Sequence, residues 1–484
     1  MTHPTLRRAR FLLVTALAAA LMALTSAGPA QAAPGQTAAV QAHLLWSQYD
    51  AADRERMLDR AREAGAGMVR VDLGWASLEQ DGKGQWNGWY LNKIDHVVEE
   101  AHQRGIKVLF TFWETPCWAS TAPESLKQGC SGSWWNRSVQ RYPPADARDY
   151  GNALAFLIRR YGDRVSAWEL WNEPNHSHYF KAADPVASYA DMVKAAYPAA
   201  KAADPKATII AGSLADADFD FTQKLLDRGV GGNFDAWSVH PYSEDRSPVH
   251  PGISGWTKKS FAVGVPQVRT TLLRKGERKP IWLTEFGWST CTVRGQAAYE
   301  NCVDENTQAG WLEQAFSYMR NWDYVPVAAA FNIEDTSDDR GDRVENYGLL
   351  RTDGTPKPAF AGFRAGARLL NSNQGIPPAV TPRGRRSAAT PARRVTLRAG
   401  RRSGRVRIAG NLSWGRTLRV RAYRWKPHQR RWSRDASYRA LIKVRANGNF
   451  RHRLSSKALR RGRWLIVVKG RRTPLLQARK AVGR

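Results

Sequence analysis

The stretch Trp168–Asn175, "WELWNEPN", sets two glutamates, Glu169 and Glu173, four residues apart among tryptophans. The segment Val165–Trp171 has the short, largely apolar character of a buried strand, and Pro174 marks its end. Carboxyl groups are rarely embedded among aromatic side chains unless they are paired or exchange protons. The stretch therefore predicts an acid at a strand end, and the fold determines which other side chains lie near that acid.

Short apolar segments alternate with longer amphipathic ones between about Ala42 and Leu370. Parallel strands require crossover helices, so eight strand–helix repeats in roughly 330 residues favour a closed (β/α)8 TIM barrel. An open doubly wound sheet is the alternative, although no glycine-rich phosphate turn follows the first expected strand. The expected strands are His43–Trp46, Met68–Leu73, Lys107–Phe112, Val165–Trp171, Ala207–Gly212, Asp235–His240, Pro280–Glu285 and Val327–Phe331.

The pattern changes after the expected barrel domain, residues 33–370. Residues 371–391 are rich in Pro, Ser, Gly and Arg, which is typical of a linker. Residues 392–484 alternate with period two and contain six short strand-like segments. This spacing predicts a small all-β, sandwich-like accessory domain of antiparallel strands with arginines on its outer face.

The positive charge of the chain belongs to this last region. Residues 376–484 contain 33 Lys and Arg against one acid, Asp435, whereas the preceding residues contain 41 basic and 42 acidic residues. A local charge of +32 should attract anionic partners: acidic exopolysaccharides, phosphate-bearing wall polymers, lipid headgroups or extracellular DNA. No module for specific nucleic-acid recognition is present. The alternative is a solvated accessory domain whose charge reflects overall composition alone.

Residues 1–32 have the layout of a secretory signal peptide, with basic residues, an apolar run from Phe11 to Leu24 and small residues ending at Ala32. Paired Arg7 and Arg8 leave the twin-arginine route open beside the general one. We expect an exported protein, extracellular or associated with the cell surface, without a transmembrane segment. Proximity favours two disulfides among the four cysteines, Cys117–Cys130 and Cys291–Cys302.

A second acid lies at the end of another expected strand. Catalytic groups of (β/α)8 barrels lie at the carboxyl ends of the strands. Glu173 ends the fourth strand and Glu285, in "PIWLTEFGWST", ends the seventh. Two such glutamates facing one barrel mouth are what a retaining glycosidase requires, with carboxyl groups about 5–5.5 Å apart.

With "WELWNEPN", "SVHPYS", "LTEFGWST" and "YGLLRTDGTPKPAF", the core resembles the clan A retaining glycoside hydrolases, most of all family 39 and its bacterial relatives. The resemblance covers about residues 40–370. It implies hydrolysis of O-glycosidic, mostly β, bonds by double displacement, with Glu173 as acid/base and Glu285 as nucleophile. It further implies that Asn172 holds the sugar 2-hydroxyl and Arg70 lies near the nucleophile, which His240 and Tyr242 flank.

Several loop tryptophans near the expected strand ends could stack against sugar rings, with Trp288 and Trp113 foremost. Where many members of the clan have a tryptophan on strand eight, this sequence has Phe331. We expect Glu169 to be a structural acid inside the barrel, and neither a cofactor nor a metal. The same residues would serve a transglycosylase, and a non-catalytic glycan- or surface-binding protein is the alternative from another class. The sequence does not specify the sugar.

Overall fold

The computed structural model describes residues 35–252, 257–293 and 301–371, together with eight strands between residues 395 and 482. The expected signal peptide and residues 372–391 of the expected linker lie outside the described residues. The chain divides into two compact units, Met1–Pro377 and Pro378–Arg484. Each unit is described by itself.

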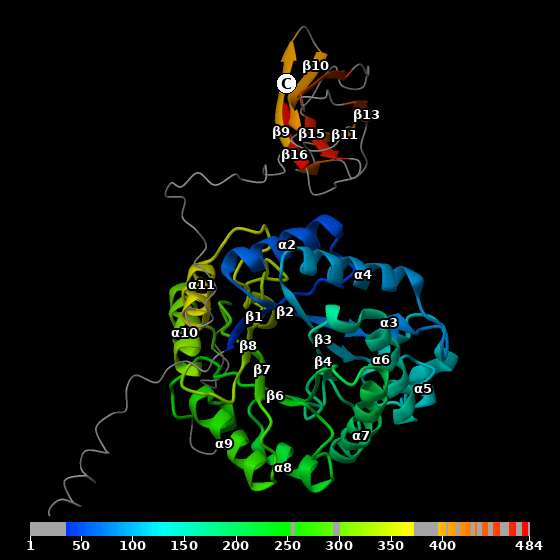
Figure 1. Cartoon of the computed structure of the whole chain (residues 1–484), viewed down its shortest axis with the longest axis vertical. Coiled ribbons are helices and arrows are strands. Elements are labelled where there is room, and N and C mark those ends of the chain that lie inside the picture. The colour runs from blue at the N-terminus through cyan, green and yellow to red at the C-terminus, as the bar shows by residue number, and fades with distance from the viewer. Residues whose placement is uncertain are drawn as a thin grey trace, which may run out of the picture. The chain divides into compact units, whose positions relative to one another are not determined.

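The first unit is a closed barrel of eight parallel strands in the order β1 to β8. Helices surround the strands (Figure 1), which confirms the (β/α)8 architecture. The strands are β1 Thr37–Gln41, β2 Met68–Gly74, β3 Lys107–Trp113, β4 Ala167–Leu170, β5 Ile209–Ala215, β6 Ala236–His240, β7 Ile281–Phe286 and β8 Val327–Ala330. The longer helices are α2 Ala51–Ala64, α4 Gly88–Gln103, α6 Ala147–Tyr161, α7 Pro185–Ala203, α8 Phe219–Asp227, α9 Phe261–Arg274, α10 Glu305–Met319 and α11 Pro358–Asn371.

The position that we predicted for the first strand was wrong. We expected His43–Trp46, whereas β1 is Thr37–Gln41 and pairs with β2 and β8. Its residues Ala38 and Ala39 are small and fully enclosed, so packing rather than a run of bulky apolar side chains selects this strand. The segment from His43 to Trp46 is the loop beyond its carboxyl end.

Local signals set the helix boundaries. In α2, the Asp50 side chain accepts hydrogen bonds from the backbone of Ala52 and Asp53, and the Asp53 side chain reciprocates to complete a capping box. The helix stops at Gly65, whose φ of 89° is left-handed and favours glycine. Boundaries of this kind determine where the loops at the barrel mouth begin.

The inside of the barrel changes from apolar to polar along the strands. The lower layer is a compact apolar cluster of Ala39, Met68, Leu109, Ala167, Ile210, Ala236, Trp282, Val327 and Ala329. Two residues further along six of these strands, the next layer is polar and has no solvent exposure: Gln41, Arg70, Thr111, Glu169, Ser238 and Thr284. Buried polar groups are stable only when they are paired, so this layer must form a hydrogen-bonded network beneath the mouth.

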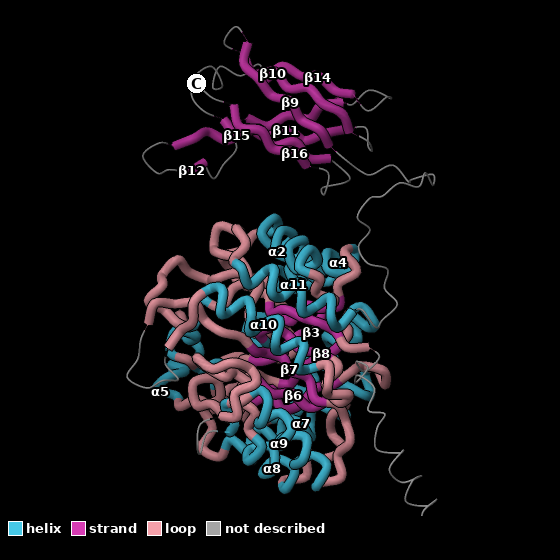
Figure 2. Tube along the Cα trace, turned by 90° about the vertical axis from the view of Figure 1, so that its left-hand side faces the viewer, coloured by secondary structure: helices cyan, strands magenta, loops and turns pink. Residues whose placement is uncertain are grey.

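The second unit contains antiparallel strands in two sheets. One sheet has the order β14-β10-β9, and the other the order β12-β11-β15-β16 with β13 also paired to β11 (Figure 2). All six expected segments contain a strand, and β12 and β16 are additional. The sandwich-like packing of these sheets stays a prediction. The strands are β9 Val395–Arg402, β10 Arg405–Leu412, β11 Thr417–Lys426, β12 Arg431–Trp432, β13 Tyr438–Lys443, β14 Asn449–Leu454, β15 Trp464–Gly470 and β16 Gln477–Val482.

None of the helices that the structure describes combines the length and apolarity needed to cross a membrane.

Candidate active site

Arg70, on β2, organises the polar layer. Its Nε donates to Glu169 Oε2 at 2.8 Å and its Nη1 to Glu285 Oε1 at 2.6 Å. The remaining bonds run to Gln41 Oε1 and Asn172 Oδ1, each at 2.9 Å. Because the guanidinium is planar and rigid, these bonds fix the relative positions of side chains from four strands or strand ends. Arg70 therefore lies beside Glu285, as the resemblance implied.

Glu169 is a structural acid, as expected. Besides Arg70 it accepts hydrogen bonds from Thr111 Oγ1 at 2.7 Å and Ser238 Oγ at 2.8 Å, and it has no solvent exposure. Burial alone would raise the pKa of its carboxyl, but the charge of Arg70, then that of His240, and the hydrogen bond from Thr111 hold that pKa below its usual value. Glu169 therefore stays ionised inside the barrel and stabilises the charge of Arg70.

Glu173 and Glu285 face one another across the mouth, with His240 between them. One carboxylate oxygen of each glutamate and one ring nitrogen of His240 all lie within 4.8 Å of one another. His240 Nδ1 lies 2.9 Å from Glu173 Oε1 and 3.7 Å from Glu285 Oε2. Both glutamates are nearly buried, at 9% and 8% exposed. This separation is close to that of two carboxyl groups acting on one anomeric carbon.

The resemblance placed His240 beside the nucleophile, and the structure brings it closer to Glu173. Burial lowers the pKa of this imidazole, but the charges of Glu285 and Glu173 outweigh burial and raise the pKa above its ordinary value. A protonated His240 would be stabilised by both carboxylates. The three side chains also have the ligand types of a metal site, but the 2.9 Å contact is that of a hydrogen bond.

Two further side chains orient the carboxyl pair. Tyr242 Oη donates to Glu285 Oε2 at 2.7 Å, so both oxygens of Glu285 are held, one by Arg70 and one by the phenol. Burial and the charge of Glu285 raise the pKa of Tyr242, which keeps its proton. Asn172 accepts from Arg70 through its carbonyl oxygen, which leaves its amide nitrogen to donate elsewhere.

The expected sugar-stacking residues fall into two groups. Trp113 is half-buried, lies edge-on to Trp171 and to Tyr179 and borders a pocket at the mouth. Phe331 lies beside Tyr347 and beside Tyr242, whose hydroxyl donates to Glu285. Trp288 is different, because only 2% of its surface is exposed and it packs between Phe286 and Trp311. A substrate platform needs an open ring face, so Trp288 is corrected to a packing residue.

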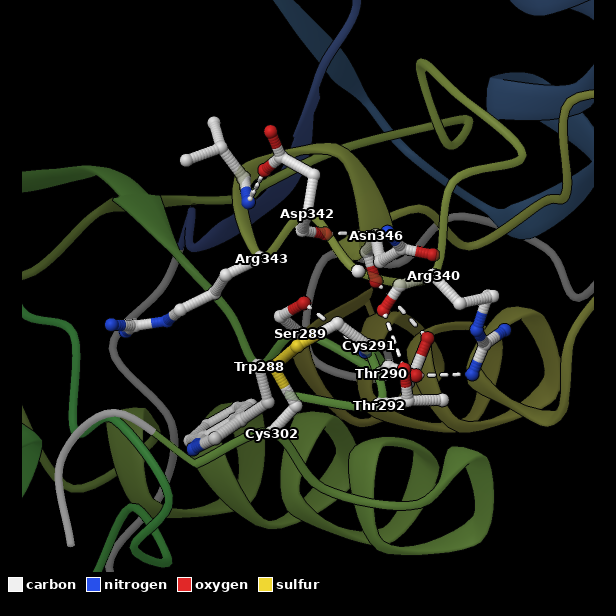
Figure 3. The surroundings of a disulfide bond; sticks show 12 residues. Trp288, Ser289, Thr290, Cys291, Thr292, Cys302, Arg340, Asp342, Arg343 and Asn346 are labelled. Carbon is white, nitrogen blue, oxygen red and sulfur yellow. Dashed lines mark hydrogen bonds between the residues drawn. A yellow bond between two sulfur atoms is a disulfide. The ribbon is translucent and has the colours of Figure 1, made fainter. Parts of the chain in front are cut away.

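Both expected disulfides, Cys117–Cys130 and Cys291–Cys302, are present. The second stabilises the loop that follows β7 and carries Trp288 (Figure 3). In that loop, Thr290 N donates to Asn346 O at 3.0 Å, and Arg340 donates to the carbonyl oxygen of Thr290. The loops after β7 and β8 are therefore held together beside the site.

A side pocket of about 380 Å³ opens at the ends of β1, β2 and β3. Two acids, Asp72 and Glu114, line it together with aromatic rings. Asp72 Oδ2 accepts from Gln41 Nε2 at 2.8 Å and lies 3.1 Å from His43 Nδ1. Since Gln41 also accepts from Arg70, hydrogen bonds connect the pocket to the carboxyl pair. The lining residues are Leu45, Trp46, Ser47, Gln48, Asp72, Gly74, Ser77, Trp89, Tyr90, Lys93, Trp113 and Glu114.

Glu114 has an unusual place in this pocket. Its backbone φ is 68°, in the left-handed region, and no donor among the described residues reaches its carboxylate. Burial, followed by the charge of Asp72, raises the pKa of Glu114 to about 7. The carboxylate lies against Gly74, where an added Cβ would come within 2.6 Å of Glu114 Oε2. The absence of a side chain at Gly74 thus provides the space that the Glu114 carboxylate occupies.

We did not expect Gln41, His43, Asp72 or Glu114 at the site. Glu114 satisfies the criterion that found Glu173 and Glu285, since it directly follows β3 in "TFWETP". Asp72 lies two residues beyond Arg70 and therefore points to the same side of β2. Gln41 and His43 had no comparable signal, because the first strand was expected to begin six residues too late, at His43 and not at Thr37.

Residues 29–335 match the family model for cellulase, glycosyl hydrolase family 5. The chain belongs to this family. This membership confirms the resemblance to clan A retaining glycoside hydrolases and the prediction of a glycosidase domain. Families 5 and 39 share the barrel with the acids on strands four and seven, so motifs that resemble family 39 are consistent with the match.

The curated relatives share short segments with this chain. Beta-glucosidase 3 of Oryza sativa subsp. japonica is 26% identical over 113 residues, which are 23% of this chain and 20% of that protein. A beta-glucosidase of Agrobacterium sp. is 30% identical over 122 residues, 25% and 23% of the two chains. The matches thus span about a fifth of the relatives' length.

Solved structures share the fold. A family 39 glycoside hydrolase from Bacteroides cellulosilyticus WH2 has a TM-score of 0.53 and 21% identity, over 87% of this chain and 79% of that chain. GH5_18 from Streptomyces cattleya has a TM-score of 0.51 and 16% identity, over 72% and 83%. At these identities the likeness shows the fold alone.

Proposed function

We propose that the protein is an exported retaining β-glycosidase in which Glu173 is the general acid/base and Glu285 the nucleophile. The observation that carries this proposal is the carboxyl pair at the ends of β4 and β7, with oxygens within 4.8 Å and one member bound to Arg70. A pair at this separation suits direct attack on the sugar, whereas inverting enzymes need about 6.5–9.5 Å to admit a water.

In the first step, a Glu285 oxygen attacks the anomeric carbon while the bond to the leaving oxygen breaks. Glu173 gives its proton to that oxygen, and a glycosyl ester on Glu285 remains. Arg70 and Tyr242 hold Glu285 before attack, so little reorganisation is needed. The amide nitrogen of Asn172, for which no acceptor is found among the described residues, would donate to the 2-hydroxyl, a bond that strengthens as positive charge develops on the ring.

In the second step, Glu173 accepts a proton from a water molecule whose oxygen attacks the anomeric carbon. The bond to Glu285 breaks, and the product keeps its original anomeric configuration. His240 lies 2.9 Å from Glu173 and acts as a positioning residue that stabilises its carboxylate between the steps. Transfer to another sugar in place of water would use the same residues.

We further propose that the side pocket receives a sugar without negative charge. Asp72 and Glu114 accept hydrogen bonds from hydroxyl groups, whereas a uronate carboxylate there would be repelled. Trp113 and the exposed ring of Trp46 offer apolar faces for a sugar ring. Lys93 also lines the pocket, but its ammonium donates to the carbonyl oxygens of Leu45 and Trp46. We therefore do not expect it to bind an acidic sugar. Neutral β-glucosides, the substrates in the names of the curated relatives, suit such a pocket.

The test is release of new reducing ends from neutral and acidic β-glycans by the wild type, Glu173→Gln and Glu285→Gln, each checked for folding by thermal unfolding. Release by the wild type alone, with the first-formed product in the original anomeric configuration by NMR, is the expected result. Inversion, or undiminished release by either variant, would contradict the assignment. Binding by all three proteins without any release would indicate a glycan-binding protein instead.

Export is part of this proposal and rests on the residues of the expected signal peptide and on the two disulfides. Expression of the full chain in a bacterial host, followed by N-terminal sequencing of the protein in the medium, tests it. A mature terminus at Ala33 is expected, and a full-length chain retained in the cell would contradict it.

A further inference from the structure

The strand register of the second unit places arginines on one face of the β14-β10-β9 sheet. Residues paired directly across antiparallel strands share a face, and residues two apart along a strand do so too. Arg405 pairs with Arg402, Arg407 pairs with Arg453, and Ala409 pairs with both Arg398 and Arg451. We call these six residues the arginine face: Arg398, Arg402, Arg405, Arg407, Arg451 and Arg453.

The opposite face of the same sheet has a different composition. Its residues are Val395, Leu397, Ala399, Arg401, Val406, Ile408, Gly410, Leu412, Phe450, His452 and Leu454. One sheet face is thus mostly apolar, as expected for a face that packs against other elements, and the other is basic. Strand β9 is in contact with β16 of the second sheet. Burial of the apolar face would leave the arginine face to solvent.

We propose that the arginine face binds an acidic polysaccharide, which goes beyond the reaction proposed for the barrel. Neighbouring strands lie about 4.8 Å apart and alternate residues about 7 Å apart along a strand. The face therefore carries three rows across the strands with two arginines in each. In two rows the arginines are direct neighbours, and in the third Ala409 lies between Arg398 and Arg451. Guanidinium forks bind carboxylate and phosphate groups in a bidentate manner, which suits a polymer that carries such a group at regular intervals.

The other residues on the arginine face favour a glycan over other polyanions. They are Thr396, Gly400, Ala409, Asn411 and Asn449. None is aromatic, so the face has no platform on which the bases of single-stranded nucleic acid could stack. None is a large apolar residue that could insert into a bilayer. Threonine and asparagine instead hydrogen-bond hydroxyl groups, and the barrel of the same chain belongs to a family that acts on glycans.

The decisive experiment compares two full-length variants with the same loss of charge. One changes Arg398, Arg407, Arg451 and Arg453 to Gln on the arginine face. The other changes Arg460, Arg461, Arg471 and Arg472, which lie outside the described strands, to Gln. Binding is measured against immobilised polygalacturonate and a phosphate-bearing wall glycan, over a salt series from about 50 to 500 mM. The two glycans distinguish carboxylate from phosphate recognition.

We expect the first variant to bind the preferred glycan about tenfold or more weakly, and the second to bind within about threefold of wild type. Equal weakening of both variants would overturn the proposal, because total charge would then explain binding. Tighter wild-type binding to DNA or to anionic phosphatidylglycerol vesicles than to either glycan would also overturn it.

A fourfold Arg→Lys variant on the same face guards against misfolding. It keeps the charge and should retain part of the affinity, with strands verified by circular dichroism. Release of reducing ends from a short neutral oligosaccharide should be unchanged in all variants. If the wild type releases no reducing ends, the proposed reaction is contradicted. If it releases them but binds neither glycan, only the proposal for the arginine face is contradicted.

Discussion

Two regions at the same barrel mouth differ in the hydrogen bonding of their polar groups. One is the carboxyl centre, formed by Glu173, Glu285 and the side chains around them, and the other is the side pocket. In the centre, Arg70 and Tyr242 each donate to Glu285, at 2.6 and 2.7 Å, and Arg70 also donates to Asn172 at 2.9 Å. In the pocket, the Glu114 carboxylate has no donor among the described residues, and its pKa is raised to about 7. The centre is preorganised for its chemistry, whereas the pocket has an acceptor that a ligand would satisfy.

The largest expected effect comes from breaking the centre at Arg70. Arg70→Met leaves Glu169 and Glu285 without their buried cation, so we expect kcat to fall by about 10³-fold or more. Unfolding in urea should show a loss of about 3–5 kcal/mol, since removal of one partner leaves a buried charge uncompensated. Arg159→Met, at an exposed position of α6, is the matched control. Unchanged stability would mean that the network does not hold the layer together.

Tyr242→Phe tests a single bond within the centre. Removal of the hydroxyl leaves one Glu285 oxygen without its donor, so we expect kcat to fall about 10–100-fold with KM changed little. Tyr318→Phe, on α10 away from the mouth, should behave as wild type. If KM rises while kcat is kept, Tyr242 binds substrate and does not position the nucleophile.

Glu114→Gln tests the pocket. Loss of a carboxylate acceptor should raise KM for a neutral oligosaccharide about tenfold and leave kcat nearly unchanged. Glu99→Gln, on the exposed side of α4, removes the same charge elsewhere and should have no effect. A fall in kcat without a change in KM would mean that Glu114 takes part in the reaction and not in substrate binding. The two regions would then not differ in function.

The smallest effect is the pH dependence of stability from Glu114. Its folded pKa, about 7, lies above the ordinary value of 4.5, so its favourable contribution is complete below about pH 4.5 and is lost as the pH rises through 7. Above pH 7 we expect Glu114→Gln to be more stable than wild type by about 1 kcal/mol, and equal to it at pH 4. Urea unfolding at both pH values measures this. A constant difference would mean that Glu114 does not titrate in this range.

The sequence predicted the barrel and the two facing glutamates because both depend on local patterns. Glu173 and Glu285 stand at strand ends that Pro174 and the apolar run before Glu285 mark clearly. The first strand was missed because Ala38 and Ala39 are selected by close packing inside the barrel, which no single segment reveals. Trp288 was misjudged for a similar reason, since the register shift in β7 between Leu283 and Phe286 changes which side the following residues face.

Gln41 restricts what can be changed at the boundary between the two regions. Its carbonyl oxygen accepts from a cation, Arg70, and its amide nitrogen donates to an anion, Asp72. Glutamate at this position would repel Asp72, lysine would repel Arg70, and a hydrocarbon would remove one hydrogen bond from each of them. The tryptophans of the pocket wall can therefore be varied to fit another sugar. Position 41 must keep an amide, which offers an acceptor to the cation and a donor to the anion.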